Sequence, residues 1–165
     1  MNKPRLSIAA LFLSATGLVG IVLHEDYTDR AIQPVAGDKW TNGFGATTRD
    51  DGSPVRPGDT TTPPKALKRA LSSIYGFEGA VKQCVKVPLT QGEYDSAISL
   101  AFNVGSSAFC KSTMVRHYNA GRYAEACAEF DRWTFYQGKD CRIRSNGCYG
   151  LVTRRAAERK QCEGG

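Results

Sequence analysis

The sequence predicts an α+β protein in which a small β-hairpin lobe precedes a larger helical lobe, with an apolar helix at the N-terminus. Residues 27–48 alternate like two short strands around a turn. Most of the chain beyond residue 62 has apolar residues at helical spacing. A stretch dense in Pro, Gly, Asp and Thr, "RDDGSPVRPGDTTTPP", lies between them and predicts a loop that separates the two lobes.

The N-terminal segment resembles a membrane anchor. Lys3 and Arg5 precede an uncharged run from Leu6 to Leu23 that just reaches the length needed to span a hydrocarbon core. The basic end should stay cytoplasmic, which sends the rest of the chain across the membrane. The run contains small and polar residues that make it a weak anchor, namely Ser7, Ser14, Thr16, Gly17 and Gly20.

Three fates are open to this segment: cleavage, retention in the membrane, and escape from it. The run ends in "IVLHEDYTD", which has no small-x-small cleavage site, so the sequence favours retention or escape. An amphipathic core helix is disfavoured because the run has no polar face. We therefore expect residues 1–23 to be an anchor segment and residues 24–165 to form the exported domain.

The hairpin is expected between Tyr27 and Thr48. The turn residues lie between Pro34 and Asp38, and "WTNGFGATT" has the aromatic, β-branched and glycine positions of a strand that another backbone approaches closely. Helices are then expected where the apolar spacing is helical. They are a segment from residue 65 after a cap at Thr62, one from Thr90 to Gly105 with a capping box that uses Glu93, and later ones near 111–121, 122–133 and 150–162.

Six cysteines in the second half of the chain predict disulfides in an exported protein. Zinc would prefer close cysteine pairs or more histidines than His24 and His117, so neither a metal nor a cofactor is expected. Cys141 and Cys148 flank the short polar loop "RIRSNG" and are the first choice for a bridge. The pairing of the other four is left open by the sequence; they are Cys84, Cys110, Cys127 and Cys162.

The net charge of +6 and the pI near 9.1 favour an acidic polymer as partner. Nucleic acid, anionic lipid and bacterial cell wall all fit that description. The basic residues are scattered and form no zinc-finger, homeodomain or RNA-binding signature, so no nucleic acid partner is expected.

Carboxylates are the candidates for chemistry, because no nucleophile elbow or phosphate loop is present. Glu25 lies where the apolar segment meets the hairpin, and partial burial there would raise the pKa of its carboxyl and suit it to act as a general acid. A solvated glutamate at a helix end is the simpler alternative. His24 is expected to be an exposed or interfacial residue at that helix end.

The pattern that starts at Glu25 resembles the phage-type lysozymes of glycoside hydrolase family 24 over nearly the whole chain after the apolar segment. The most specific matches are "WTNGFG", which resembles the T-x-G-x-G strand of that family, "AFNVGSSAFCKSTMVRHYNAG" and "GLVTRRAAER". The weakly apolar start resembles the signal-arrest-release subgroup of phage endolysins. The resemblance implies a lysozyme-like fold and hydrolysis of the β-1,4 bond between N-acetylmuramic acid and N-acetylglucosamine in peptidoglycan.

In such enzymes a glutamate protonates the leaving oxygen, an aspartate positions or activates water, and a threonine contacts that water. Glu25 matches the acid and Thr41 matches the threonine. The aspartate departs from the pattern E-x8-D-x5-T, because its position falls at Pro34 or Val35. We expect Asp38 to replace it, followed by Asp29 and then Asp26, although Asp38 would also suit a simple Gly-Asp turn.

Asn103 is expected to face the substrate, beside Phe102. Trp133, Phe130 and Tyr123 are expected to pack the helical lobe. The basic residues of the last helix are expected to form a solvated face; they are Arg154, Arg155 and Arg159.

The resemblance also predicts the cellular path: export to the host periplasm, a first stage tethered to the inner membrane, and action there as a monomer. The apolar segment holds no cysteine, so a disulfide exchange started by an anchor thiol is excluded and control would be steric or topological. Two other functions remain as alternatives: an exported cationic wall-binding protein without catalysis, and a lytic transglycosylase.

Overall fold

The structure is a computed structural model that describes residues 4–35 and 37–164. The chain forms two compact units. The helical unit comprises residues 1–17 and 77–165, and the hairpin unit comprises residues 18–76. Helix α1 (Ala15–Val22) and helix α2 (Pro63–Cys84) each begin in one unit and end in the other.

The first part of the apolar N-terminal segment, up to Gly17, belongs to the helical unit, and the segment is not one continuous helix. A single 3-10 turn, η1 (Ile8–Ala10), is followed by extended backbone and then by α1. Leu6 pairs with Leu89 through two backbone hydrogen bonds of 2.8 and 3.0 Å. In the part of the chain that the structure describes, no helix is both long and apolar enough to cross a membrane.

Buried carboxylates of the helical unit accept hydrogen bonds from this segment. Glu78 accepts from the backbone N–H of Leu13 at 3.0 Å. Asp95 accepts from the backbone N–H of Ser14 at 3.0 Å and from its hydroxyl at 2.5 Å, while the Ser14 hydroxyl accepts from the N–H of Gly17. Ser14 therefore acts as the N-cap of α1, because its oxygen satisfies an N–H of the first turn.

A core helix was disfavoured here because the run has no polar face, and that argument was wrong. Leu11 and Ile21 are only 1% exposed, whereas Phe12, Val19 and Leu23 are well exposed. A helix without a polar face can pack on one side and leave its other apolar residues in water, since exposed apolar residues are common on protein surfaces.

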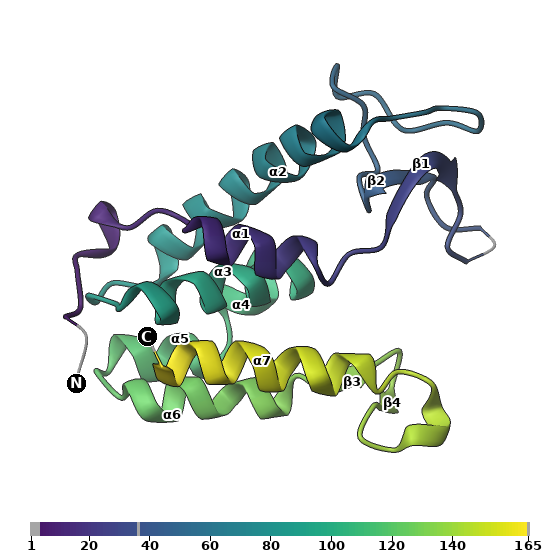
Figure 1. Cartoon of the computed structure of the whole chain (residues 1–165). Helices are drawn as coiled ribbons and strands as arrows, with labels where there is room; N and C mark the ends of the chain where they lie inside the picture. The colour runs from purple at the N-terminus through teal and green to yellow at the C-terminus, as the bar shows by residue number, and fades with distance from the viewer. Residues whose placement is uncertain (1–3, 36, 165) are drawn as a thin grey trace. The chain divides into compact units, whose positions relative to one another are not determined.

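The hairpin unit contains the two strands expected from the glycine-rich stretch. Strand β1 (Tyr27–Ile32) pairs antiparallel with β2 (Thr41–Phe44), with an irregular register between Thr28 and Ile32. The loop from residue 49 to 59 returns to β1 and leads into α2 (Figure 1). The backbone bonds between Ala31 and Asp59 and between Thr61 and Asp29 attach the end of this loop to β1.

In the helical unit, α3 (Gln91–Val104) packs against α7 (Gly150–Gly164) (Figure 1). The capping box predicted for Thr90 and Glu93 is confirmed, and α3 ends at Gly105 as expected. Phe130 is fully buried, as expected of a packing residue. Between these two helices lie α4 (Ser106–Cys110), α5 (Thr113–Asn119), α6 (Tyr123–Ala128) and η2 (Glu129–Arg132).

A second small hairpin precedes α7, and the sequence did not predict it. It pairs β3 (Phe135–Tyr136) with β4 (Lys139–Asp140), and η3 (Arg144–Asn146) follows. The disulfide between Cys141 and Cys148, the pair favoured by spacing, closes this region. The other bridges join Cys84 to Cys110 and Cys127 to Cys162, which fixes the pairing that the sequence left open.

Candidate active site

Glu25 lies in the turn that follows α1, three residues after the helix ends at Val22. The backbone N–H groups of Leu23, His24 and Glu25 donate to carbonyls of the last turn, at 2.9, 3.1 and 3.1 Å. Glu25 is partly buried and lies two residues before β1 begins. Its backbone is therefore fixed between a helix end and the first strand of the hairpin.

A tight turn from Asn42 to Ala46 lies against the Glu25 carboxylate. The turn is closed by two reciprocal backbone bonds between its end residues, at 3.1 and 3.0 Å. Gly45 has a φ of +71°, and a Cβ built on it would lie 3.5 Å from Oε2 of Glu25. The backbone of the turn thus comes close to the carboxylate, in a conformation that glycine adopts most easily.

The other glycine of the turn allows the strand to approach α2. A Cβ built on Gly43 would lie 2.7 Å from the Cβ of Ala66, and its φ is +62°. Both glycines of "TNGFGA" are therefore required by the packing of the hairpin unit: one faces Glu25 and the other faces α2.

Thr41 begins β2, paired with Ile32, and is partly buried. Asp38 lies three residues earlier in an exposed turn, where its N–H donates to Val35 and its carbonyl accepts from the Gln33 side chain. Asp26 and Asp29 are also exposed. The choice among the three aspartates stays a prediction.

Asn103 lies in the last turn of α3, in the helical unit, and is exposed. Its side-chain oxygen accepts a hydrogen bond from the Arg155 guanidinium. The amide N–H groups and the second lone pair of the oxygen remain for a ligand. The expected role of Asn103 in substrate binding stays a prediction.

The expectation of a solvated basic face on α7 was wrong for two of its three arginines. Arg154 and Arg155 are only 6% and 1% exposed. Both donate to Glu158, which also accepts from the Ser99 hydroxyl at 2.5 Å. Burial lowers the pKa of Arg155, and the neighbouring Glu158 opposes that shift. The spacing of three and four residues to a glutamate was the sequence signal for this cluster.

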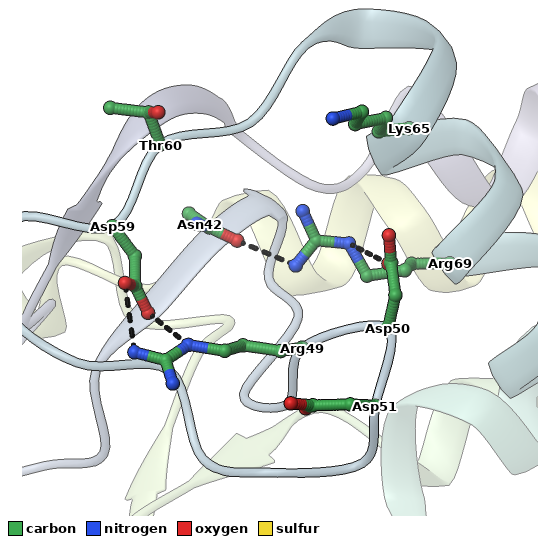
Figure 2. Close-up of a pocket in the computed structure, with 8 residues that line it drawn as sticks. All are labelled: Asn42, Arg49, Asp50, Asp51, Asp59, Thr60, Lys65 and Arg69. Carbon is green, nitrogen blue, oxygen red and sulfur yellow. Dashed lines mark hydrogen bonds and ion pairs between the residues drawn. The ribbon is translucent and has the colours of Figure 1, made fainter.

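A recess of about 310 Å³ in the hairpin unit was not predicted (Figure 2). Arg49 and Asp59 form a two-bond ion pair on one side of it, at 2.7 and 2.9 Å. The hydrogen bond from Arg49 holds the pKa of Asp59 below its ordinary value. On the other side, Arg69 reaches from α2 to Asn42, the first residue of the turn beside Glu25, at 3.0 Å. The recess is also lined by Asp50, Asp51, Thr60 and Lys65.

Comparison with known proteins identifies the family. The family model described as phage lysozyme matches residues 23–158. An endolysin of Acyrthosiphon pisum secondary endosymbiont phage 1 is 35% identical over 153 residues, 90% of this chain and 96% of that protein. A SAR-endolysin of Escherichia phage 933W is 36% identical over 166 residues, 93% of this chain and 90% of that protein.

The fold agrees with this family. The solved structure of an endolysin from Escherichia coli O157:H7 phage FAHEc1 superposes with a TM-score of 0.80 at 32% identity, and covers 93% of this chain and 94% of that one. The sequence, the structure and the placement of Glu25 beside a glycine-rich hairpin turn agree: the chain belongs to the phage lysozyme family and is a glycoside hydrolase.

Proposed function

We propose that the protein is an endolysin that hydrolyses the β-1,4 bond between N-acetylmuramic acid and N-acetylglucosamine in peptidoglycan, with Glu25 as the general acid. The observation that supports this proposal is the position of Glu25. It is partly buried, and its Oε2 lies 3.5 Å from where a Cβ on Gly45 would be. The positive net charge favours binding to an anionic wall.

In the proposed reaction, the Glu25 carboxyl gives its proton to the glycosidic oxygen as the C–O bond breaks. Water attacks the sugar carbon from the opposite face, which inverts the configuration at that carbon. The water loses a proton to a second carboxylate, so one proton is given and one is taken up and the net charge of the site is unchanged. Thr41 contacts the attacking water, and Asp38 is our first candidate for the carboxylate that activates it. Asn103 donates from its amide to the substrate.

The test is mass spectrometry of the muropeptides that the purified protein releases from peptidoglycan. Hydrolysis adds water across the bond, so reducing muramic ends are expected. Glu25→Gln should reduce product by about 100- to 10,000-fold, and Asp38→Asn should reduce it by at least about 100-fold. Asp29→Asn serves as the matched control, since it removes the charge of another exposed hairpin aspartate.

Other products would point elsewhere. Anhydro-muramic ends would identify a lytic transglycosylase, and wall binding without product would identify a non-catalytic wall-binding protein. Full activity in Asp38→Asn with loss in Asp29→Asn would move the water-activating role to Asp29.

We further propose that the protein acts as a monomer and is exported with residues 1–23 as an anchor in the inner membrane, before release into the periplasm. Support comes from the basic start, the uncharged run to Leu23, and a relative named SAR-endolysin. In the folded form, Ser14 and Leu13 use carboxylates of the helical unit to satisfy their backbone N–H groups. In a bilayer, only a continuous helix would satisfy them.

The two glycines of α1 allow release to be tested. Replacing both Gly17 and Gly20 by Leu should keep the protein on the membrane and inactive. Gly20→Leu alone is the cleaner variant, because an added Cβ at Gly20 meets nothing within 4 Å. It should shift the protein to the membrane fraction and delay lysis of the expressing cells. Normal lysis with a normal soluble fraction would refute the anchor.

A further inference from the structure

Arg69 connects α2 to three separate segments of the hairpin unit. Figure 2 shows two of these contacts, those with Asn42 and Asp50. One guanidinium nitrogen donates to the Asn42 side-chain oxygen at 3.0 Å and to the Thr48 carbonyl at 3.3 Å, and the other donates to the Thr61 hydroxyl. Nε forms an ion pair with Asp50 at 3.2 Å. The Arg69 side chain is only 14% exposed.

Asn42 is the central contact among these. It is 2% exposed, although an amide side chain costs free energy to bury unless it has hydrogen-bond partners. Its backbone N–H and C=O both pair with Ala46 and close the turn, and its side-chain oxygen pairs with Arg69. Asn42 therefore joins Arg69 to the turn itself.

The same turn borders the candidate catalytic residues. Thr41 directly precedes Asn42. Gly45 lies inside the turn and faces Glu25: a Cβ built on Gly45 would lie 3.5 Å from Oε2 of Glu25. Any movement of Asn42 thus moves the backbone next to Glu25 and Thr41. We propose that Arg69 is a positioning residue for hydrolysis: it sets the 42–46 turn against Glu25 through Asn42. This inference rests on the proposed muramidase function.

Arginine suits this role because its planar guanidinium presents several donors in a fixed arrangement. Lysine keeps the charge but, as a point charge on a flexible stem, cannot hold Asn42 and Thr61 in one fixed geometry. A misplacement of a catalytic group by about 1 Å can reduce the rate by about 100-fold. We therefore expect an effect on kcat without a comparable effect on substrate binding.

The test is the steady-state kinetics of Arg69→Met on soluble, uncross-linked glycan strands, at a temperature well below the Tm of every variant. We expect kcat to fall by about 10- to 100-fold and KM to change by less than about 2-fold. Arg69→Lys should fall between this variant and the wild type. Arg49→Met and Lys65→Met are matched controls. Both residues line the same recess, but Arg49 pairs with Asp59 rather than with Asn42, and both variants should keep kcat.

A second set of variants tests the route through Asn42. Asn42→Asp keeps an acceptor for Arg69 and should retain most of kcat, whereas Asn42→Leu should lose as much as Arg69→Met. The double variant Arg69→Met/Asn42→Leu should be no slower than either single variant. If Arg69→Met does not fold, Asn42→Leu compared with Asn42→Asp gives the same comparison.

An unchanged kcat in Arg69→Met, or an equal loss in Arg49→Met, would overturn the positioning role. Strictly additive losses in the double variant would also overturn it, because Arg69 would then act apart from Asn42. These outcomes differ from a failure of the muramidase proposal, in which the wild type itself releases no product with reducing ends.

Discussion

The two units of the chain are stabilised by different means. All three disulfides lie in the helical unit, together with most of the fully buried large side chains. Among the described residues, the buried apolar side chains of the hairpin unit are few: Ile21, Val55, Ala66, Ala70 and Ile74. The hairpin unit depends instead on ion pairs and on hydrogen bonds of Arg49 and Arg69.

This difference separates stability from catalysis. We expect the unit with the covalent links and the larger apolar core to contribute most of the folding free energy. The unit that carries Glu25 and Thr41 uses directional polar contacts, which fix geometry more than they add stability. Variants of the disulfides and the core of the helical unit should therefore change Tm, and variants of Glu25 or of the contact between Arg69 and Asn42 in the hairpin unit should change kcat.

The largest effect is expected at Glu25, and it tests whether the hairpin unit carries the catalytic residue. Glu25→Gln keeps the shape of the side chain but removes the proton donor, so activity on peptidoglycan should fall by about 100- to 10,000-fold. The Tm should stay close to that of the wild type. The matched control is Glu125→Gln, on the exposed surface of α6 in the helical unit, which should keep full activity. Substantial activity in Glu25→Gln would show that Glu25 is not the general acid.

The second effect concerns the disulfides. The bridge between Cys127 and Cys162 has a sequence separation of 35, so replacing both by Ala should lower the free energy of unfolding by about 4 kcal/mol in the chain-entropy model. The bridge between Cys141 and Cys148, with a separation of 7, should cost about 2.5 kcal/mol. Chemical denaturation measures both, and kcat well below Tm should not change.

Equal losses from the two bridges would show that chain entropy does not set their contributions. A fall of kcat with either bridge would show that the helical unit takes a direct part in the chemistry.

The features that could be predicted from the sequence are those with local signals. The capping box at Thr90, the glycine turn of the hairpin and the short Cys141 to Cys148 loop all lie within a few residues. The contact between Ser14 and Asp95 joins residues 81 apart, and that between Arg69 and Asn42 joins residues 27 apart. No local pattern specifies such partners.

The N-terminal segment shows why composition was misleading there. Its apolar character is compatible with a bilayer and with a protein surface. Partners distant in the sequence, among them Glu78 and Asp95, satisfy its backbone where the helix is broken and so make the second environment suitable. For the candidate site, Glu25 and the motif "TNGFG" could be predicted from the sequence. Both glycines of the motif have a positive φ, and Gly45 lies beside Glu25. The aspartate could not be identified, because the spacing departs from the family pattern at that residue.

A smaller effect is expected at Gly17, where the N-terminal segment packs on α3. A Cβ added there would lie 2.7 Å from Cγ of Asp95 and 2.7 Å from Cδ1 of Leu13. Gly17→Ala should therefore lower the free energy of unfolding by about 1–3 kcal/mol through overpacking. Gly20→Ala, with nothing within 4 Å of its added Cβ, should raise it by up to about 1 kcal/mol. Equal Tm values for both variants would contradict this packing.

The smallest effect is expected at Asp59, and it measures how much the ion pair with Arg49 stabilises the hairpin unit. The hydrogen bond from Arg49 lowers the pKa of Asp59 in the folded protein from its ordinary value of 3.8. A carboxyl whose pKa is lower in the folded than in the unfolded state stabilises the fold above the unfolded pKa, and this contribution is lost as the pH falls through the folded pKa. Because both side chains of the pair remain partly exposed to solvent, Asp59→Asn should lower Tm by only about a degree or two at pH 7.

The difference in Tm between wild type and Asp59→Asn should shrink as the pH falls below 3.8, and high salt at pH 7 should reduce it as well. Arg49→Met should show the same pH dependence, since it removes the other partner of the bond. A Tm difference that stays constant down to acid pH would assign the effect of Asp59 to contacts that do not depend on the charge of its carboxyl. In that case the loop is held by turn geometry, and the ion pair contributes little to the hairpin unit.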